Sequence, residues 1–357
     1  MDPLPAQPQL DGSPAFVDDP VPPGGGTSVP VVKVFVRDLA DGAGVESPFL
    51  VREVTRRQKR NGDAFLKLKL GDVTGMVEGV MWDGVDAAVE VAVAGAVVVA
   101  SGSYSVDQKY GACLTIRSLR PAGDHEYDPA DLHDAPPVPF EQMAGDLREL
   151  IETIQDPHLR ALLDRFFADG CPIWERWSTA PAAKHYHQAY RHGLLEHSLS
   201  VASGVSAMSA CFPGIDRDVA VTGALLHDIG KIEAYAMEGG AIDLTDAGRL
   251  QGEIPLGYYM VRRQIEELPG FPPQVAEAVL HIILSHHGQL EHGSPVVPCT
   301  REATLVHMID NLGGRLGSFD RIEKSLAEGQ RWSGFDRALS GAAYFSGRGV
   351  AGLGEAA

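Results

Sequence analysis

The run Leu225-Leu226-His227-Asp228-Ile229-Gly230-Lys231 decides the fold of the second half of this chain. A histidine and an aspartate stand side by side after an apolar stretch that begins at Val219, and a glycine follows two residues later. This order predicts the C-terminal end of a buried helix. A neutral imidazole and a carboxylate both bind metal ions, so we expect this helix end to face a cavity and to form part of a metal centre.

The remaining candidate ligands lie in other mostly apolar segments with helical spacing, and ten of the thirteen histidines fall between His185 and His307. A hydrogen-bonded core histidine is the plainer interpretation of any one of them. Two imidazoles and two carboxylates together, however, suit Mn²⁺, Mg²⁺ or Fe²⁺ better than structural zinc, which favours thiolates. This candidate set is His197, His227, Asp228 and Asp310.

The size and composition of the chain are those of a globular cytoplasmic protein. Its 357 residues leave room for two domains with cores of their own, plus tails. No signal peptide is visible, and the longest apolar run, from Val89 to Ala100, is too short to cross a membrane. Four cysteines without CxxC spacing are expected to be reduced and buried: Cys113, Cys171, Cys211 and Cys299.

The net charge of −18 at first argues against nucleic acid as a partner. The charge is uneven, however. Residues 31–121 contain 12 Lys and Arg against 11 Asp and Glu, which gives +1, so the rest of the chain carries −19. A nucleic-acid role for the first domain therefore stays open.

Hydrophobic periodicity divides the chain into five segments, and the predicted fold is multidomain. Residues 1–30, with eight prolines and a triple glycine, are expected to be a disordered leader. Short strands over 31–121 predict a small β-barrel, with the OB-fold as the best candidate. An acidic, proline-rich linker over 122–139 leads to an all-α domain over 140–330. The last segment, 331–357, is a tail that we expect to be frayed from about Gly341.

The stretch from Ala64 to Leu70 alternates strictly, so its leucines are expected to face a core and Phe65, Lys67 and Lys69 to face outward. A basic turn with the tight-reversal pair Asn61-Gly62 precedes it. An aromatic ring between lysines is what single-stranded nucleic acid needs for stacking and backbone contact. A solvated face whose lysines block edge pairing is an equally good interpretation. The candidate nucleic-acid-binding residues are Arg56, Arg57, Lys59, Phe65, Lys67, Lys69 and Trp82.

Five blocks of the second domain together resemble one known family. They are Lys184-His185-Tyr186-His187-Gln188-Ala189-Tyr190, the segments from Gly193 to Val201 and Leu225 to Lys231, Ile283-Leu284-Ser285-His286-His287-Gly288, and His307-Met308-Ile309-Asp310-Asn311-Leu312. With the strand region from Asn61 to Asp83, they are similar to the YhaM-type 3′-5′ exoribonucleases. That family places an OB-fold before an HD domain, the helical metal-dependent phosphohydrolase fold. The resemblance covers about residues 31–320.

The resemblance implies a set of metal ligands. His197, His227, Asp228 and Asp310 would hold one ion, while Asp228 would bridge to a second ion held by His286 and His287. Where the family usually has a histidine after a glycine, this chain has Glu253, which would take that place. His192, where the family tends to have glycine, is a second departure. Whether one or two ions bind therefore stays open.

The resemblance also implies the reaction. Asp228 and Lys231 are expected to be catalytic, and Lys231 and His187 to contact a substrate phosphate. A lysine favoured by the negative end of a helix is the alternative for Lys231. We expect a 3′-5′ exoribonuclease, most simply with Mn²⁺, in which a metal-activated water releases nucleoside 5′-monophosphates from single-stranded RNA.

Single-stranded DNA as a substrate and a homo-oligomeric state are left open. A second interpretation is an HD phosphohydrolase of small nucleotides whose OB domain is regulatory. A third is a non-catalytic nucleic-acid binder that uses the HD domain as a scaffold, which the complete ligand set disfavours.

Overall fold

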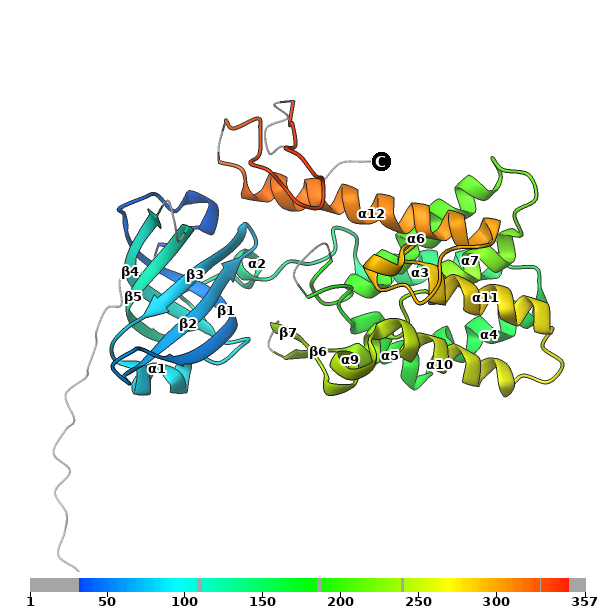
Figure 1. Ribbon diagram of the computed structural model, residues 1–357, viewed down its shortest axis with the longest axis horizontal. Coiled ribbons are helices and arrows are strands. Elements are labelled where there is room, and N and C mark those ends of the chain that lie inside the picture. Colours follow the sequence, from blue (N-terminus) through cyan, green and yellow to red (C-terminus); the bar gives the residue numbers. More distant parts are fainter. Residues whose placement is uncertain (1–31, 108–110, 185–187, 239–240, 328, 347–357) are drawn as a thin grey trace, which may run out of the picture. The chain divides into compact units, whose positions relative to one another are not determined.

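A β-barrel is followed by a helical domain in the computed structural model, which describes residues 32–107, 111–184, 188–238, 241–327 and 329–346 (Figure 1). The expected leader over 1–30 lies outside the described residues, as do His187 and the end of the tail. Within the described parts of the chain, none of the helices combines the length and the hydrophobicity that crossing a bilayer requires.

Five strands close into a barrel in the order β1-β2-β3-β5-β4, in which β3 and β5 run parallel and the other neighbours antiparallel. The predicted small OB-like barrel is thus confirmed. The strands are β1 (Gly44–Gln58), β2 (Ala64–Asp72), β3 (Gly75–Met81), β4 (Val97–Asp107) and β5 (Gly111–Pro121). A short helix, α1 (Val85–Val91), adds Val85 and Ala88 to the barrel core.

The alternation in β2 works as expected, because Leu66, Leu68 and Leu70 are each at most 1% exposed. The basic turn is shorter than expected. Arg56 and Arg57 belong to β1, opposite Leu66 and Phe65, and the reversal begins only at Lys59. Adjacent residues of a strand point to opposite faces, so these two arginines are directed to different sides of the sheet.

The linker carries structure of its own. Within the linker lies α2 (Pro129–Leu132). A separate 3₁₀-helix (Val36–Asp38) lies outside the linker and precedes β1. Leu132 is fully buried, and the carbonyl of Asp131 accepts a hydrogen bond from the backbone of Val73 in the barrel. The part of the linker around α2 therefore belongs to the barrel's packing.

The second domain is helical, as predicted. Prolines stand at the first position of α4, α5 and α11, where the missing N–H costs nothing, so each of them marks a helix start. Its helices are α3 (Phe140–Glu152), α4 (Pro157–Phe167), α5 (Pro172–Thr179), α6 (Gly193–Ser209), α7 (Arg217–Leu226), α8 (Lys231–Ala234), α9 (Asp246–Gln251), α10 (Glu253–Glu266), α11 (Pro273–Ser285), α12 (Arg301–Ser325) and a 3₁₀-helix (Leu290–His292).

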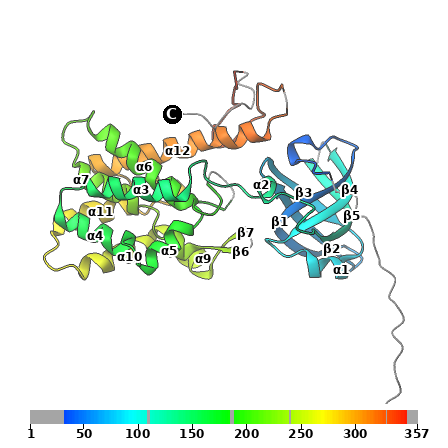
Figure 2. The same cartoon turned by 180° about the vertical axis from the view of Figure 1, so that it is seen from behind.

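The centre of this domain is α7, which packs on α6 and on α11, and α12 packs on all three helices. Every residue of α7 from Val219 to Leu226 is buried, so this helix is surrounded on all sides. Figure 2, the view from behind, shows α3 crossing in front of this core. A two-stranded hairpin, β6 (Tyr235–Glu238) with β7 (Ala241–Leu244), was not predicted and interrupts the helical pattern.

The tail and the cysteines differ from expectation. Backbone bridges join Trp332 to Tyr344 and Asp336 to Gly341, and Ala343 is 2% exposed, so the described part of the tail is folded rather than frayed from Gly341. The cysteines are free thiols, but the expectation of burial was wrong, since Cys211 and Cys299 are exposed on the surface.

Candidate metal centre

The end of α7 aims the His227 ring. Asp216 caps the start of the helix by accepting hydrogen bonds from the backbone of Asp218 and Val219, and the regular helix ends at Leu226. His227 Nδ1 lies 2.7 Å from the carbonyl oxygen of Ala224. A carbonyl can only accept, so Nδ1 carries the proton and the Nε2 lone pair is directed into the domain.

The end of α11 repeats this arrangement with His286. Its Nδ1 donates to the carbonyl of Ile283, again three residues back, at 2.8 Å. Both imidazoles are about 1% exposed, and both are fixed by the last turn of their own helix. The same local geometry therefore presents two Nε2 acceptors from two helix ends.

His197 comes from the first turns of α6. Its Nδ1 faces Gln188 Oε1 at 3.1 Å, which fixes the ring from the side away from the centre. Gly193 makes this approach feasible, because a Cβ at that position would lie 2.0 Å from the Gln188 carbonyl oxygen. Gln188 stands in one of the blocks quoted from the sequence, but nothing in the sequence marked it as an orienting residue.

The structure brings the four residues of the first predicted set together. His197 Nε2 lies 3.2 Å from His227 Nε2, 3.2 Å from Asp228 Oδ2 and 3.2 Å from Asp310 Oδ1. His227 Nε2 lies 3.3 Å from the same Asp228 oxygen and 3.9 Å from Asp310 Oδ1. Ligand atoms of His197, His227 and Asp228 all fall within 4.8 Å of one another. Three helix segments thus converge on one buried point.

The chemistry of this point fits a divalent cation. Asp228 Oδ1 and His286 Nε2 are buried without a hydrogen-bond partner in the described structure, and they lie 3.5 Å apart. Leaving one such group unsatisfied costs about 1–3 kcal/mol. A cation between imidazole nitrogens and carboxylate oxygens satisfies these groups, and this mixture of donors suits manganese, iron or magnesium.

The second predicted group of ligands, which includes His287 and Glu253, is more exposed to solvent. His287 Nδ1 donates to the carbonyl of His292 at 2.9 Å, and its Nε2 lies 3.7 Å from Glu253 Oε1. Glu253 is the first residue of α10, and Gly230 lets that helix start approach closely, because a Cβ on Gly230 would lie 2.0 Å from the Glu253 carbonyl oxygen. The glycine of the HD run therefore lets the start of α10 bring the Glu253 carboxylate close to this group.

Lys231 faces the candidate ligands. Its Nζ lies 2.7 Å from Asp228 Oδ2. Burial lowers the pKa of Lys231, but the Asp228 carboxylate outweighs it and raises that pKa. Burial likewise raises the pKa of Asp228, yet the charge of Lys231 and the neighbouring His227 ring bring it well below its usual range. The pair is therefore ionised inside the domain.

Charge is also balanced at His197 and Asp310. Burial alone would lower the pKa of His197, but its hydrogen bonds to Asp228 and Asp310 raise it to about 9. Burial raises the pKa of Asp310, but the hydrogen bond from His197, together with the nearby His227 ring, more than reverses this rise. In the protein alone, a proton on His197 thus offsets the carboxylates, as a cation would.

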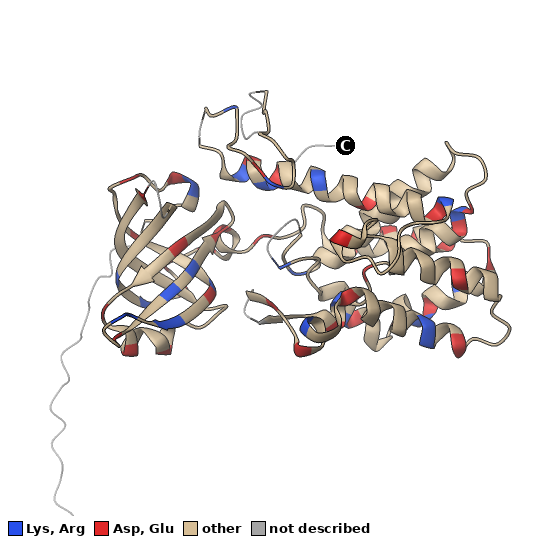
Figure 3. Ribbon diagram, in the orientation of Figure 1, with Lys and Arg blue, Asp and Glu red and all other residues tan. Residues whose placement is uncertain are grey.

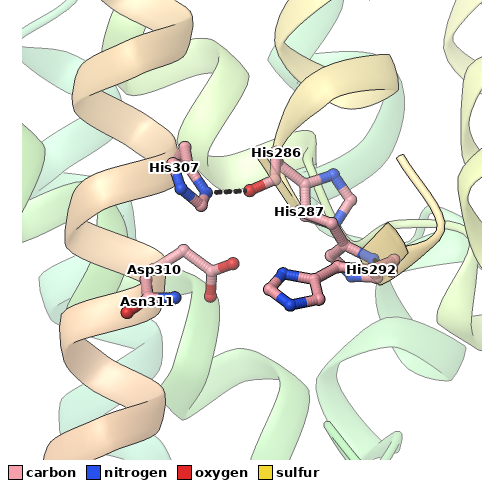
Figure 4. A pocket seen from close by; sticks show the side chains of 6 residues that line it. All are labelled: His286, His287, His292, His307, Asp310 and Asn311. Atoms are coloured by element: carbon pink, nitrogen blue, oxygen red, sulfur yellow. Dashed lines mark hydrogen bonds between the residues drawn. The ribbon is translucent and has the colours of Figure 1, made fainter. Parts of the chain in front are cut away.

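A cavity of about 280 Å³ adjoins the centre. Figure 4 shows the α12 side chains on one side of it and the histidines that follow α11 on the other. Its lining residues are His286, His287, His292, His307, Asp310 and Asn311. Three of these were not predicted as site residues. His307 and Asn311 flank Asp310 in a quoted block, which is the one available signal, whereas nothing in the sequence marked His292.

The candidate nucleic-acid-binding residues do not form one basic face. Phe65 and Trp82 stack with ring centroids 4.9 Å apart, and Lys59 Nζ lies 5.7 Å from the Trp82 centroid. Three other cations are each paired with a carboxylate: Lys67 with Glu78 at 2.8 Å, Lys69 with Glu53 at 3.0 Å and Arg56 with Asp86 at 2.9 Å. Figure 3 shows the resulting mixture of blue and red on the barrel.

Comparison with known proteins shows which family this chain resembles. The HD domain family matches residues 194–314. A 3′-5′ exoribonuclease YhaM from Bacillus velezensis is 30% identical over 300 residues, which cover 81% of this chain and 90% of that protein. This chain belongs to the YhaM family of 3′-5′ exoribonucleases.

Other YhaM proteins agree with this assignment. The YhaM of Geobacillus sp. strain WCH70 is 30% identical over 296 residues, covering 81% of this chain and 88% of that protein. The YhaM of Bacillus subtilis is 28% identical over 292 residues, with 81% and 90% covered. The resemblance inferred from the motif blocks is thus confirmed. Because the matches extend well beyond the HD domain's own 194–314, they include sequence outside it.

Proposed function

We propose that this chain is a divalent-metal-dependent nuclease that degrades single-stranded RNA from the 3′ end to nucleoside 5′-monophosphates, with Mn²⁺ as its metal. One observation carries this proposal. Asp228 presents one oxygen to two imidazoles and the other, unpartnered, to a third imidazole, beside a cavity open to a ligand. A bound divalent ion there would supply charge neutralisation for a phosphodiester and a more acidic water.

The chain's own residues have distinct parts in this proposal. His197, His227 and Asp310 hold one side of the centre, while His286, His287 and Glu253 hold the other. Asp228 is shared by both groups and is expected to be indispensable. Lys231, ionised beside Asp228, is proposed to contact a phosphate oxygen. His187 is proposed for the same role, although it lies outside the described residues. Because the protein carries a net charge of −18, the Lys231 cation also reduces repulsion of an anionic substrate.

The barrel is proposed to hold the single strand. The Phe65–Trp82 stack offers a surface for bases, and stacking on an aromatic ring tolerates any base and either sugar, so single-stranded DNA is included as a substrate. Exposed ion pairs are worth at most about 1 kcal/mol. Lys67 and Lys69 can therefore exchange their carboxylate partners for phosphates at little cost. We further propose a cytoplasmic location and leave the oligomeric state to measurement.

The direct test uses single-stranded RNA labelled at its 5′ end, incubated with the protein and Mn²⁺. The expected result is a ladder that shortens from the 3′ end, together with release of nucleoside 5′-monophosphates and arrest by EDTA. Intact RNA in the presence of Mn²⁺ would reject the proposal. Continued decay in EDTA would reject metal dependence.

A double variant of the barrel, Phe65→Ala with Trp82→Ala, separates the nuclease from a phosphohydrolase of small nucleotides. Loss of stacking is expected to raise KM for a long single strand at least about tenfold, since each stacked base contributes roughly 1–3 kcal/mol. Val106→Ala, on another exposed strand position, is the matched control. Normal RNA decay by the double variant would exclude this stack from strand binding. Hydrolysis of mononucleotides by wild type with RNA left intact would instead support the small-nucleotide function.

A further inference from the structure

The α12 wall of the cavity carries two polar side chains that the proposed metal chemistry does not use. His307 and Asn311 lie one helical turn apart, on either side of Asp310 in the sequence, and both line the cavity (Figure 4). Side chains four residues apart on a helix are neighbours on one face, about 5–6 Å apart at Cβ. The two groups can therefore contact the same small ligand.

The His307 ring is fixed in position. Its Nδ1 lies 2.7 Å from the carbonyl oxygen of His286 and must donate to it, so in the neutral ring Nε2 is an acceptor. Gly288, with φ +79°, lies directly beneath the ring, and a Cβ there would lie 2.1 Å from His307 Cε1. Among the described residues, Nε2 has no hydrogen-bond partner.

Asn311 supplies the complementary groups. It is exposed to the cavity, and its amide offers two N–H donors and a carbonyl acceptor. Within the described structure its side chain makes no hydrogen bond. An acceptor nitrogen next to an amide matches a pair of adjacent hydroxyls, each of which can donate and accept. The vicinal hydroxyls of a ribose have this chemistry.

The position of the α12 side of the cavity also fits a ribose as the ligand. A nuclease that releases nucleoside 5′-monophosphates attacks the phosphate joined to the 5′ oxygen of the departing ribose. That phosphate must lie at the metal centre. The ribose attached to it must therefore lie directly beside the centre. Asp310, on the same turn of α12, has one carboxylate oxygen 3.2 Å from His197 Nε2. The cavity next to Asp310 is therefore where the terminal sugar belongs.

We propose that His307 Nε2 and the Asn311 amide bind the 2′ and 3′ hydroxyls of the 3′-terminal ribose and favour a ribonucleotide end over a deoxyribonucleotide end. This proposal rests on the proposed nuclease function, because it assigns the sugar subsite of the same centre. A site built to hydrogen-bond a hydroxyl rejects an analogue without it, since its own polar groups are then left unpaired.

The first test compares two RNA substrates of the same sequence, one of which ends in a 2′-deoxynucleotide. Wild-type protein is expected to remove the terminal ribonucleotide with a kcat/KM about tenfold higher, the loss of roughly one hydrogen bond. His307→Phe is expected to bring this ratio close to one. His307→Gln, whose amide oxygen can accept, is expected to keep part of the preference. Thr304→Val, one turn earlier on α12, is the matched control and should leave the ratio unchanged.

The second test needs no turnover. AMP and 2′-deoxy-AMP are titrated into the Mn²⁺-loaded protein by calorimetry, and AMP is expected to bind about tenfold more tightly to wild type but equally to His307→Phe. Equal binding of the two nucleotides by wild type would overturn the proposal. So would a variant that slows removal of both ends by the same factor, since this indicates a positioning role alone. Tighter AMP binding with no decay of RNA would reject the nuclease instead and leave the sugar subsite supported.

Discussion

The two groups of donors around Asp228 differ in how completely they are satisfied. In the first group, His197 Nε2 is 3.2 Å from His227, from Asp228 and from Asp310, and a proton on His197 offsets the carboxylates. In the second, the spacing is 3.5 Å from His286 to Asp228 and 3.7 Å from His287 to Glu253. Both contacts are too long for hydrogen bonds, and two of these atoms are buried without partners.

The atoms of the first group are thus satisfied by charges within the protein, whereas atoms of the second group are left without partners. Histidine aimed by a backbone carbonyl is common to both, so ring orientation does not distinguish them. What differs is burial, because Glu253 and His287 are 23% and 29% exposed at their side chains, whereas His197 and His227 are 4% and 0% exposed. We therefore expect the first group to bind its ion more tightly.

The largest effect is expected for Asp228→Asn, because this substitution removes the carboxylate that both groups of donors share. The amide lacks a charge and has a single acceptor oxygen, so RNA decay is expected to fall at least about 10³-fold. Bound manganese, measured by elemental analysis after gel filtration, should fall toward zero. Asp246→Asn, on the exposed start of α9, controls for the change in charge. Retention of full activity would remove Asp228 from the centre.

Paired substitutions of the two groups give the next largest effect. His227→Gln is expected to lower kcat more than Glu253→Gln, because the first ligand is fully buried and the second is partly exposed. For Glu253→Gln we expect a loss of about 10–100-fold in metal affinity, restored in part by excess Mn²⁺. Rates are measured across a manganese titration. Equal losses of activity in the two variants, neither restored by excess Mn²⁺, would show that the two groups contribute equally.

Lys231→Met gives the smallest of the three effects and separates metal binding from turnover. The ammonium lies 2.7 Å from the Asp228 oxygen that also faces the two imidazoles, so it competes with a cation for that oxygen. Removing it is expected to strengthen Mn²⁺ binding modestly while lowering kcat about tenfold through loss of a phosphate contact. Calorimetric titration with Mn²⁺ and single-turnover rates check both parts. Weaker binding together with an unchanged kcat would contradict this role.

Local patterns in the sequence were sufficient to predict much of this protein. The change from period-two alternation to helical spacing separates the barrel from the helical domain, because strand and helix place side chains at different angles. The leucines of β2 and the apolar run before His227 are buried as that periodicity requires. The prolines at the starts of α4 and α5 mark helix boundaries for a local steric reason.

Other features depend on contacts between segments distant in the sequence. The pairing of Lys67 and Lys69 with carboxylates was not predicted, because each partner lies on a neighbouring strand. His292 reaches the cavity from a short 3₁₀-helix whose position no local pattern reveals. The fold of the tail likewise depends on its return to pair with itself near Trp332.

The sequence alone determined the two domain types, the helix end that carries His227 and Asp228, and the chemical identity of the candidate ligands. These follow from the order of neighbouring residues. Tertiary packing sets the rest. It brings His197, Asp310 and Glu253 to that helix end, fixes the distance of each one, and leaves particular atoms without partners. Such distances are set by the packing of whole helices, which is a sum over many side chains and is not encoded in any single stretch.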